Sequence, residues 1–282
     1  MLTTDNLQAL LPDVVQIALN AGEQIMAIYN DSFTVTDKAD KTPVTEADMA
    51  AHRTIVSALE MLTPDVPVLS EESGDIPYTT RQKWSQYWLV DPLDGTREFI
   101  KRNGEFTVNI AFIHQDESWL GVVYAPFLKV IYAAVQGWQV IKQQADFNDP
   151  MAQAQNAPVE PIHVRPLDMD QLIVAGSRSH ADAKLGRYLK RLGRHDLITM
   201  GSSLKSCLVA EGRADLYPRI GLTSEWDTAA AQCIVEQAGG QITDTKGQRL
   251  RYNTKASLLN PHFFVFGEAH DWSQYLDKPN TR

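Results

Sequence analysis

The amino-acid sequence predicts a layered α/β (α+β) protein, in which helices pack on mixed sheets. Its 282 residues begin with long amphipathic helical patterns, continue with several short strand-like segments, and end with alternating strands and helices. Helices are indicated by apolar residues three or four positions apart, and strands by short apolar runs between turns. The length is enough for one large domain or two modest ones with a substantial core.

Two helices are predicted in the first part of the chain. Apolar side chains recur at helical spacing over residues 6–29. A second helix is predicted from Thr45, because Thr45 and Asp48 resemble a capping box and apolar residues follow at helical spacing. Residues 66–69 then form a short apolar run, which predicts a strand.

Several strands are predicted in the middle of the chain, after a buried strand at residues 88–90. The segments are joined by short links, which indicates an antiparallel meander. They span residues 107–113, 120–124, 130–135 and 138–141. Residues 143–161 are rich in Gln, Ala, Asn, Asp and Pro without periodicity, and we interpret them as a boundary or surface loop.

The last part of the chain alternates between strands and helices. Strands are predicted at residues 172–175, 214–217 and 263–266, and helices at residues 181–192, 202–210 and 227–237. The third of these helices is followed by Gly239 and Gly240, which are usual helix stops.

The composition is that of an ordinary globular enzyme, with 44% hydrophobic and 22% charged residues. The formal net charge of −9 argues against a protein that binds nucleic acid polymers, since such proteins are basic. A small anionic ligand remains compatible with this charge, because bound metal ions and a few cationic side chains invert the local field.

The expected location is the cytoplasm. Cys207 and Cys233 lie in apolar helical patterns, as buried thiols in a reducing compartment do. The N-terminus lacks a signal-peptide pattern, and no apolar run of about 18 residues predicts a transmembrane segment. Peripheral association with the cytoplasmic face of the inner membrane stays open.

The segment Asp91-Pro-Leu-Asp-Gly-Thr96 is the most informative motif in the chain. Its two carboxylates follow an apolar run, and Pro92 and Gly95 predict a rigid turn around them. Two anions held this close repel each other unless a cation or a proton lies between them. The motif therefore predicts a site for hard divalent metal ions.

Three further places end an apolar element in acidic residues: Asp48 at a helix start, Glu71 with Glu72 after a strand, and Asp227 at a helix start. Each has an ordinary alternative role when taken alone. Asp48 fits a helix cap, the Glu71 pair fits a solvated turn, and Asp227 fits stabilisation of a helix dipole.

Together these motifs resemble the lithium-sensitive, magnesium-dependent phosphatases of the inositol monophosphatase superfamily. The finer resemblance is to the CysQ type of 3′(2′),5′-bisphosphate nucleotidase, and it covers nearly the whole chain. The matching segments are Val68-Leu-Ser-Glu-Glu72, the run from Asp91 to Asn109, Ser177-Arg-Ser-His-Ala-Asp182, Gly201-Ser-Ser-Leu-Lys205, Leu216-Tyr-Pro-Arg219 and Trp226-Asp227-Thr-Ala-Ala. The resemblance implies a layered αβαβα sandwich, with a metal-binding catalytic half at residues 1–145. A substrate-binding half at residues 160–282 would contribute Asp227 and pack with the first as one catalytic unit.

The resemblance also implies the metal ligands: the carboxylates of Glu71, Asp91, Asp94 and Asp227, and the backbone carbonyl of Leu93. The family usually has Ile at the position of Leu93, but only the carbonyl is used. All-oxygen ligands favour Mg²⁺, and two or three ions are expected.

Catalytic roles follow for residues around the motif. The Thr96 hydroxyl is expected to orient the attacking water, and resemblance pairs it with either Asp48 or Glu71. Gly95 and Thr96 also offer backbone N–H groups to phosphate oxygens. Arg97 fits either the steering of anions or simple solvation.

By the same resemblance, the second half of the chain lines the adenosine and the 5′-phosphate of the substrate. Ser202 and Lys205 are one helical turn apart, so both can face one anion. The residues expected to contact substrate are Glu71, Asp94, Gly95, Thr96, Arg97, Ser179, His180, Ser202, Lys205, Arg219 and Asp227. Taken alone, Lys205 and Arg219 also fit solvated surface charges, and His180 fits a surface or capping histidine.

The implied function is Mg²⁺-dependent hydrolysis of 3′-phosphoadenosine 5′-phosphate to AMP and phosphate, in sulfur assimilation and nucleotide recycling. An inositol or sugar phosphatase is the alternative enzyme, and a non-catalytic nucleotide-binding regulator is the alternative of another class. Preference for the 5′-phosphosulfate form of the nucleotide and the oligomeric state are left open.

Overall fold

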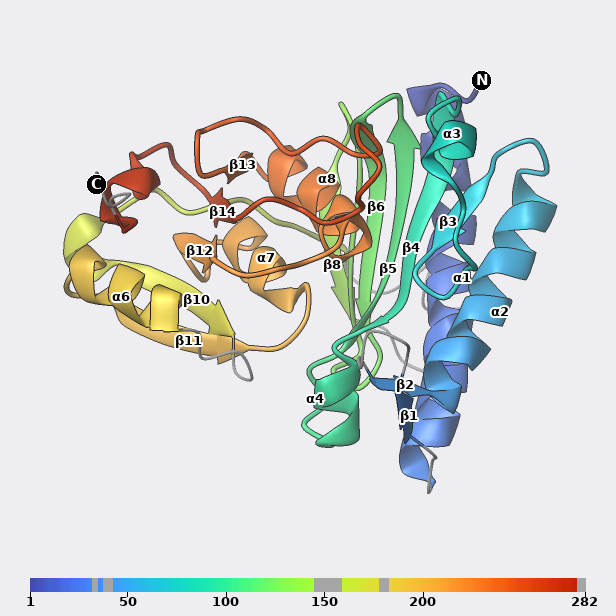
Figure 1. Ribbon diagram of the computed structural model, residues 1–282, viewed down its shortest axis with the longest axis horizontal. Coiled ribbons are helices and arrows are strands. Elements are labelled where there is room, and N and C mark those ends of the chain that lie inside the picture. The colour runs from blue at the N-terminus through green and yellow to red at the C-terminus, as the bar shows by residue number, and fades with distance from the viewer. Residues whose placement is uncertain (32–34, 38–42, 145–158, 178–182, 278–282) are drawn as a thin grey trace.

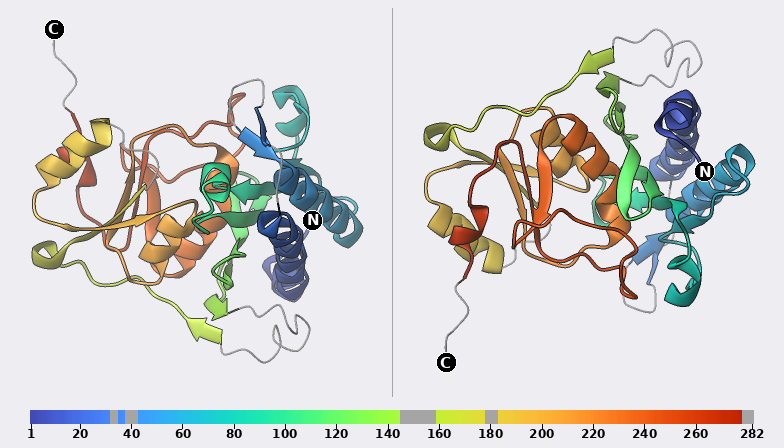
Figure 2. Two further views of the ribbon diagram at one scale, coloured as in Figure 1. Left: turned by 90° about the horizontal axis from the view of Figure 1, so that it is seen from below. Right: turned by 90° about the horizontal axis from the view of Figure 1, so that it is seen from above.

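The protein folds into five stacked layers of alternating helices and sheets, as the computed structural model shows (Figure 1). The structure describes residues 1–31, 35–37, 43–144, 159–177 and 183–277. Helices α1 and α2 form one outer layer, and a large sheet lies beside them. Helices α7 and α8 separate that sheet from a smaller one, and α6 lies on the outside of the smaller sheet (Figure 2). The predicted fold class is confirmed.

The large sheet contains seven strands in the described residues, in the order β3-β4-β5-β6-β7-β8-β9. Strand β3 runs parallel to β4, and each later strand pairs antiparallel with its neighbour in the chain, which confirms the predicted meander. The strands are β3 (Val68–Ser70), β4 (Gln86–Asp94), β5 (Thr107–His114), β6 (Glu117–Ala125), β7 (Val130–Val135), β8 (Val140–Gln144) and β9 (Val159–Pro161).

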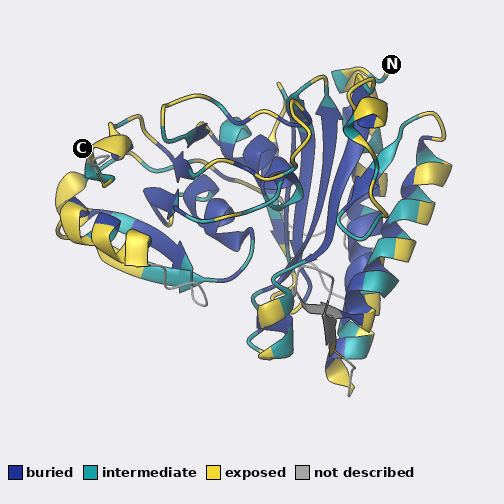
Figure 3. Cartoon of the chain, viewed as in Figure 1, coloured by how far each residue is buried: buried dark blue, intermediate teal, exposed yellow. Residues whose placement is uncertain are grey.

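The two faces of this sheet pack into different cores, because successive side chains of a strand point in opposite directions. On β4, Trp88 and Val90 pack against α1 (Thr4–Asn30) and α2 (Glu46–Leu62). Tyr87 and Leu89 point the other way, into the core shared with α7 and α8. Most strand residues are buried, except on edge strands such as β11, and exposed positions are frequent on the outer helices and in the loops (Figure 3). The large sheet therefore separates two hydrophobic cores.

The smaller sheet contains five strands among the described residues, in the order β11-β10-β12-β14-β13. Strands β10 (Ile173–Ser177), β11 (Asp196–Met200) and β12 (Leu216–Arg219) run parallel, whereas β14 (Phe263–Phe266) is antiparallel to its neighbours β12 and β13 (Gln241–Asp244). The helices on this side are α6 (Ala183–Leu192), α7 (Leu204–Ala210) and α8 (Ala229–Gln237).

Some boundaries differ from the sequence prediction. Helix α7 begins at Leu204 rather than at Ser202, and α8 begins at Ala229 because residues Glu225–Asp227 form a separate 3₁₀ turn, η2. Elements that the sequence analysis did not predict are β1 (Val35–Asp37), β2 (Pro43–Thr45), β9, β11, β13, η1 (Met169–Gln171), η3 (Trp272–Tyr275), α3 (Tyr78–Arg81) and α4 (Thr96–Ile100). Residues 145–158 of the predicted loop lie outside the described residues. No described helix is both long and apolar enough to cross a bilayer.

Candidate active site

A β-bulge brings the two aspartates of the central motif to the same face of the large sheet. In register, Asp91 lies opposite Asn109 and Asp94 lies opposite Thr107, so β4 has one more residue than β5 between these pairs. In a regular strand, side chains three positions apart point to opposite faces, and the extra residue of the bulge reverses this for Asp91 and Asp94. The predicted turn after Val90 is therefore wrong in one respect, because the strand continues through the bulge to Asp94.

The turn itself falls at Gly95, whose φ of 93° lies in the left-handed region. Helix α4 (Thr96–Ile100) begins directly after it. A Cβ at position 95 would lie 3.2 Å from the Glu105 backbone oxygen. Glycine thus allows the chain to leave the sheet sharply and to present Thr96 beside the aspartates.

Three carboxylates converge at this place. Oxygen atoms of Asp91, Asp94 and Asp227 lie within 4.8 Å of one another, and Glu71 from the end of β3 lines the same cavity. Burial, reinforced by the charge of Glu71, raises the pKa of Asp91 well above its usual range. Burial and the charge of Asp94 raise the pKa of Asp227 to about 8. A divalent cation would relieve this repulsion, and an all-oxygen donor set fits Mg²⁺.

Asp227 is held by the short turn η2 (Glu225–Asp227). Its Oδ2 accepts a hydrogen bond from the Ser224 backbone N–H at 2.9 Å. Glu225, which is fully buried, accepts a hydrogen bond from the Asn253 N–H at 2.7 Å, and Arg81 in turn donates to the Asn253 side chain. The turn that carries Asp227 is thereby fixed to the segment after β3.

Thr96 contacts Asp48 across the gap between α4 and α2. The Thr96 hydroxyl donates to Asp48 Oδ1 at 3.2 Å and lies 3.4 Å from the Leu93 carbonyl oxygen. The other oxygen of Asp48 accepts hydrogen bonds from the backbone and hydroxyl of Thr45, at 2.7 and 2.6 Å, which is the predicted capping box. Burial raises the pKa of Asp48, so this carboxylate is more basic than an exposed one.

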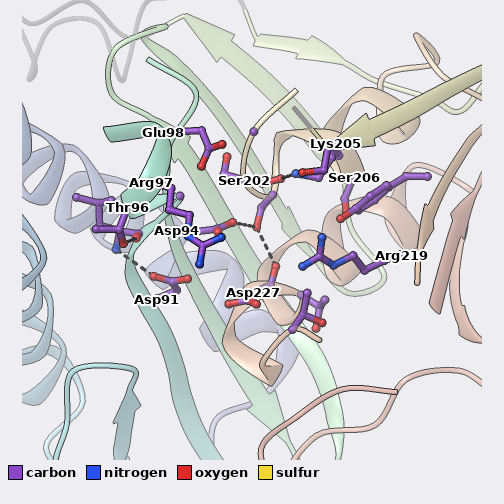
Figure 4. Close-up of a pocket in the computed structure, with 18 of the residues that line it drawn as sticks. Asp91, Asp94, Thr96, Arg97, Glu98, Ser202, Lys205, Ser206, Arg219 and Asp227 are labelled. Carbon is purple, nitrogen blue, oxygen red and sulfur yellow. Dashed lines mark hydrogen bonds between the residues drawn. The ribbon is translucent and has the colours of Figure 1, made fainter. Parts of the chain in front are cut away.

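Cationic side chains line the opposite side of the same cavity, which has a volume of about 240 Å³ (Figure 4). Lys205 is buried, donates from Nζ to the Ser202 carbonyl at 2.5 Å, and lies 5.3 Å above the Tyr217 ring. Burial lowers the pKa of Lys205 to about 8. Arg219 donates to the Leu222 carbonyl at 2.8 Å. Arg97 extends from α4 toward the carboxylates.

The structure brings together most of the residues predicted for the site. Those that line the cavity are Glu71, Asp91, Leu93, Asp94, Gly95, Thr96, Arg97, Ser202, Lys205, Arg219 and Asp227. Asp48 lies behind Thr96 and reaches the site through it. Ser179 and His180 lie outside the described residues. Ser202 precedes α7 instead of sharing a helical turn with Lys205, and its φ of 46° places it in the left-handed region.

Sequence reasoning missed several residues of the site. Ser203, Ser206, Tyr217 and Phe263 also line the cavity. Ser203 lies within the matching segment from Gly201 to Lys205, but helical spacing indicated only Ser202 and Lys205. Asn109, the last residue of the matching segment that begins at Asp91, contacts the site through its hydrogen bond to Ser203. Their roles depend on contacts between distant segments, which spacing along the chain does not reveal.

Comparison with known proteins identifies the family of this chain. The model of the inositol monophosphatase family matches residues 6–271. The chain belongs to this family. Its resemblance to 3′(2′),5′-bisphosphate nucleotidase CysQ of Escherichia coli K12 extends over 259 residues at 50% identity, covering 91% of this chain and 99% of that protein. The CysQ protein of Aggregatibacter actinomycetemcomitans is 41% identical, with coverage of 93% and 94%.

Two solved structures share the fold. CysQ from Bacteroides thetaiotaomicron, a bacterial member of the inositol monophosphatase family, superposes with a TM-score of 0.76 at 40% identity, covering 91% of this chain and 96% of that one. The extragenic suppressor protein suhB from Bartonella henselae has a TM-score of 0.75 at 24% identity, with coverage of 94% and 98%. The second likeness shows the fold alone.

Proposed function

We propose that this member of the inositol monophosphatase family is a Mg²⁺-dependent 3′(2′),5′-bisphosphate nucleotidase. Its substrate would be 3′-phosphoadenosine 5′-phosphate, hydrolysed to AMP and phosphate. The function named for its CysQ relatives, at up to 50% identity over nearly their whole length, supports this assignment. We extend the proposal to a role in sulfur assimilation and nucleotide recycling and to inhibition by lithium.

One observation carries the proposal: a single cavity has the three aspartates, with Arg97 beside them, on one side and Lys205 with Arg219 on the other. The carboxylate side, around Asp91, fits metal ions and the phosphate to be cleaved. The opposite side, with Lys205 and Arg219, fits a second phosphate that is bound but not cleaved. A substrate with two phosphates on one nucleoside matches both sides at once.

The proposed metal ligands are Glu71, Asp91, Asp94, Asp227 and the Leu93 carbonyl, holding two or three Mg²⁺ ions. Their fit rests on the convergence of the three aspartates and on the raised pKa values of Asp91 and Asp227. Bound Mg²⁺ would supply Lewis-acid stabilisation of the charge that develops on the phosphoryl and leaving oxygens.

The proton pathway that we propose runs from water through Thr96 to Asp48. Because the Thr96 hydroxyl donates its own proton to Asp48, its lone pairs are available to accept a proton from an attacking water. The raised pKa of Asp48 suits it to take the Thr96 hydroxyl proton as the water proton reaches the Thr96 oxygen. Asp48 is therefore our choice as the partner of Thr96, and Glu71 is assigned to the metal site. The backbone N–H groups of Gly95 and Thr96 would bind phosphate oxygens.

The test is phosphate release from a panel of substrates with Mg²⁺. We expect the highest kcat/KM for the bisphosphate nucleotide or its 5′-phosphosulfate form, a much lower value for inositol 1-phosphate, and inhibition by lithium. An Asp94→Asn variant should lose activity by orders of magnitude while its fold persists. A higher kcat/KM for inositol 1-phosphate would reject the nucleotide assignment, and full activity of Asp94→Asn would reject the metal assignment.

A further inference from the structure

A buried pair of polar side chains, Asn109 on the large sheet and Ser203 just before α7, lies beside two of the proposed metal ligands, Asp94 and Asp227. Asn109 Nδ2 on β5 donates to Ser203 Oγ at 2.9 Å. Ser203 Oγ lies 2.8 Å from Asp94 Oδ2 and 2.8 Å from the Asp227 backbone oxygen. One hydroxyl therefore contacts the strand pair β4–β5 and the turn η2, which are far apart in the chain.

The Ser203 hydroxyl is not used for the ordinary purpose of a serine at its position. Ser203 occupies the N-cap position of α7, where a serine side chain usually accepts a hydrogen bond from the helix backbone. Here no such bond forms, and the hydroxyl faces Asp94 and Asp227 instead. Its place in the fold is thus explained by the carboxylate site and not by helix capping.

The direction of the hydrogen bonds follows from the number of protons. A serine hydroxyl has one proton to donate, and Asn109 already donates to its oxygen. The Ser203 proton is therefore directed to the side of Asp94 and Asp227, and an ionised carboxylate is the stronger acceptor of the two. Asn109 sets the orientation of Ser203, and Ser203 sets the orientation of Asp94.

Burial protects these hydrogen bonds from competition with water. Asn109 is 1% exposed and Ser203 is 5% exposed, so water does not compete for their protons. The Asn109 Oδ1 atom is buried and has no hydrogen-bond partner in the part of the chain that the structure describes. Burying an amide oxygen without a hydrogen-bond partner costs free energy, so packing alone does not explain an asparagine here. The hydrogen bond that Asn109 Nδ2 donates to Ser203 is the interaction that explains it.

We propose that Ser203 and Asn109 are positioning residues for the metal site. They would fix the Asp94 carboxylate and the Asp227 backbone before Mg²⁺ binds. This inference rests on the proposed metal-binding role of Asp94 and Asp227. Partners of this kind, which hydrogen-bond to ligands without touching the metal, typically change metal affinity by about 10–100-fold when removed.

The experiment is calorimetric titration of Mg²⁺ into substrate-free protein, for wild type and the variants Ser203→Ala, Asn109→Ala and both together. Each single variant should weaken Mg²⁺ binding by about 10–100-fold. The double variant should be no weaker than the worse single variant, because both residues act through one oxygen. Ser203→Thr, which keeps the hydroxyl, should recover most of the affinity.

Ser118→Ala is the matched control. Ser118 is also a buried serine, 1% exposed, and donates to the Ala229 carbonyl at 2.7 Å in the same core layer. We expect it to lower the melting temperature without changing Mg²⁺ affinity. Wild-type affinity in Ser203→Ala, or equal weakening in Ser118→Ala, would overturn the inference while leaving the proposed function intact. A wild-type protein that binds no Mg²⁺ would reject both.

Discussion

At the scale of single residues, the proposed chemistry depends most strongly on the hydroxyl of Thr96. Replacing Thr96 by valine keeps the shape but removes the hydroxyl that donates to Asp48 and that, in our proposal, accepts a proton from water. We expect kcat to fall by about 10²–10⁴-fold, the range of general acid–base contributions, with little change in KM. Steady-state kinetics at saturating Mg²⁺ measures this change. Thr96→Ser should stay active, and a valine variant with wild-type kcat would exclude the pathway through Thr96.

Lys205 gives the site a pH dependence of its own. With a pKa of about 8, its ammonium is charged at pH 7 and loses its proton as the pH rises through 8, whereas an exposed lysine stays charged. Binding of the second phosphate therefore weakens with rising pH, and KM for the bisphosphate should increase between pH 7 and pH 9. Lys205→Met should show a raised KM that is flat over this interval. A flat KM in the wild type would contradict the assignment.

Residue-scale prediction from sequence succeeded where the chemistry is local. Asp91 and Asp94 stand three positions apart beside a proline and a glycine, so their motif is visible without a structure. Ser203 and Asn109 have ordinary neighbours in the chain. Their importance arises from a contact between positions 94 residues apart, which only tertiary structure creates.

At the scale of elements, the junction of β4 and α4 depends on a backbone conformation that glycine supplies. Gly95→Ala should destabilise the protein by about 1–2 kcal/mol, because alanine is strained at a φ of 93°. Its Cβ would also approach Ser202 Cβ to 3.4 Å, so activity should fall as well. Thermal unfolding and kcat measure the two effects.

Gly137→Ala is the matched control for that junction. Gly137 has a φ of 74°, but a Cβ there would have no atom within 4 Å. It should lose stability to a similar extent and keep wild-type kcat. If Gly95→Ala also keeps wild-type kcat, the shape of this junction does not govern catalysis.

Element prediction was good for segments with a clear amphipathic period or a continuous apolar run, and poor for segments without either pattern. The amphipathic pattern found α1, and the apolar runs found β7 and β14 with their observed bounds. Strand β13 (Gln-Ile-Thr-Asp) is polar at both ends, and β11 is an edge strand whose first residues are exposed, so neither shows a clear apolar run. The bulge in β4 was not predictable, because it depends on the register with β5.

At the scale of the whole molecule, the site exists because two sheets meet across the layer of α7 and α8. Asp91 and Asp94 come from the large sheet, whereas Lys205 and Arg219 come from elements around the small one. The αβαβα order of layers was implied by resemblance and is confirmed. The division into halves at residues 145–160 and the cytoplasmic location stay predictions.

The most direct test of the proposal that one cavity binds both phosphates compares 3′-phosphoadenosine 5′-phosphate with adenosine 3′-phosphate, which lacks the second phosphate. The wild type should have a clearly higher kcat/KM for the bisphosphate. Lys205→Met should lower that value by about 10–100-fold, as expected for a lost hydrogen bond to a charged group, and leave the monophosphate unchanged. Equal kcat/KM values for both substrates in the wild type, or an equal loss for both in the variant, would contradict this account.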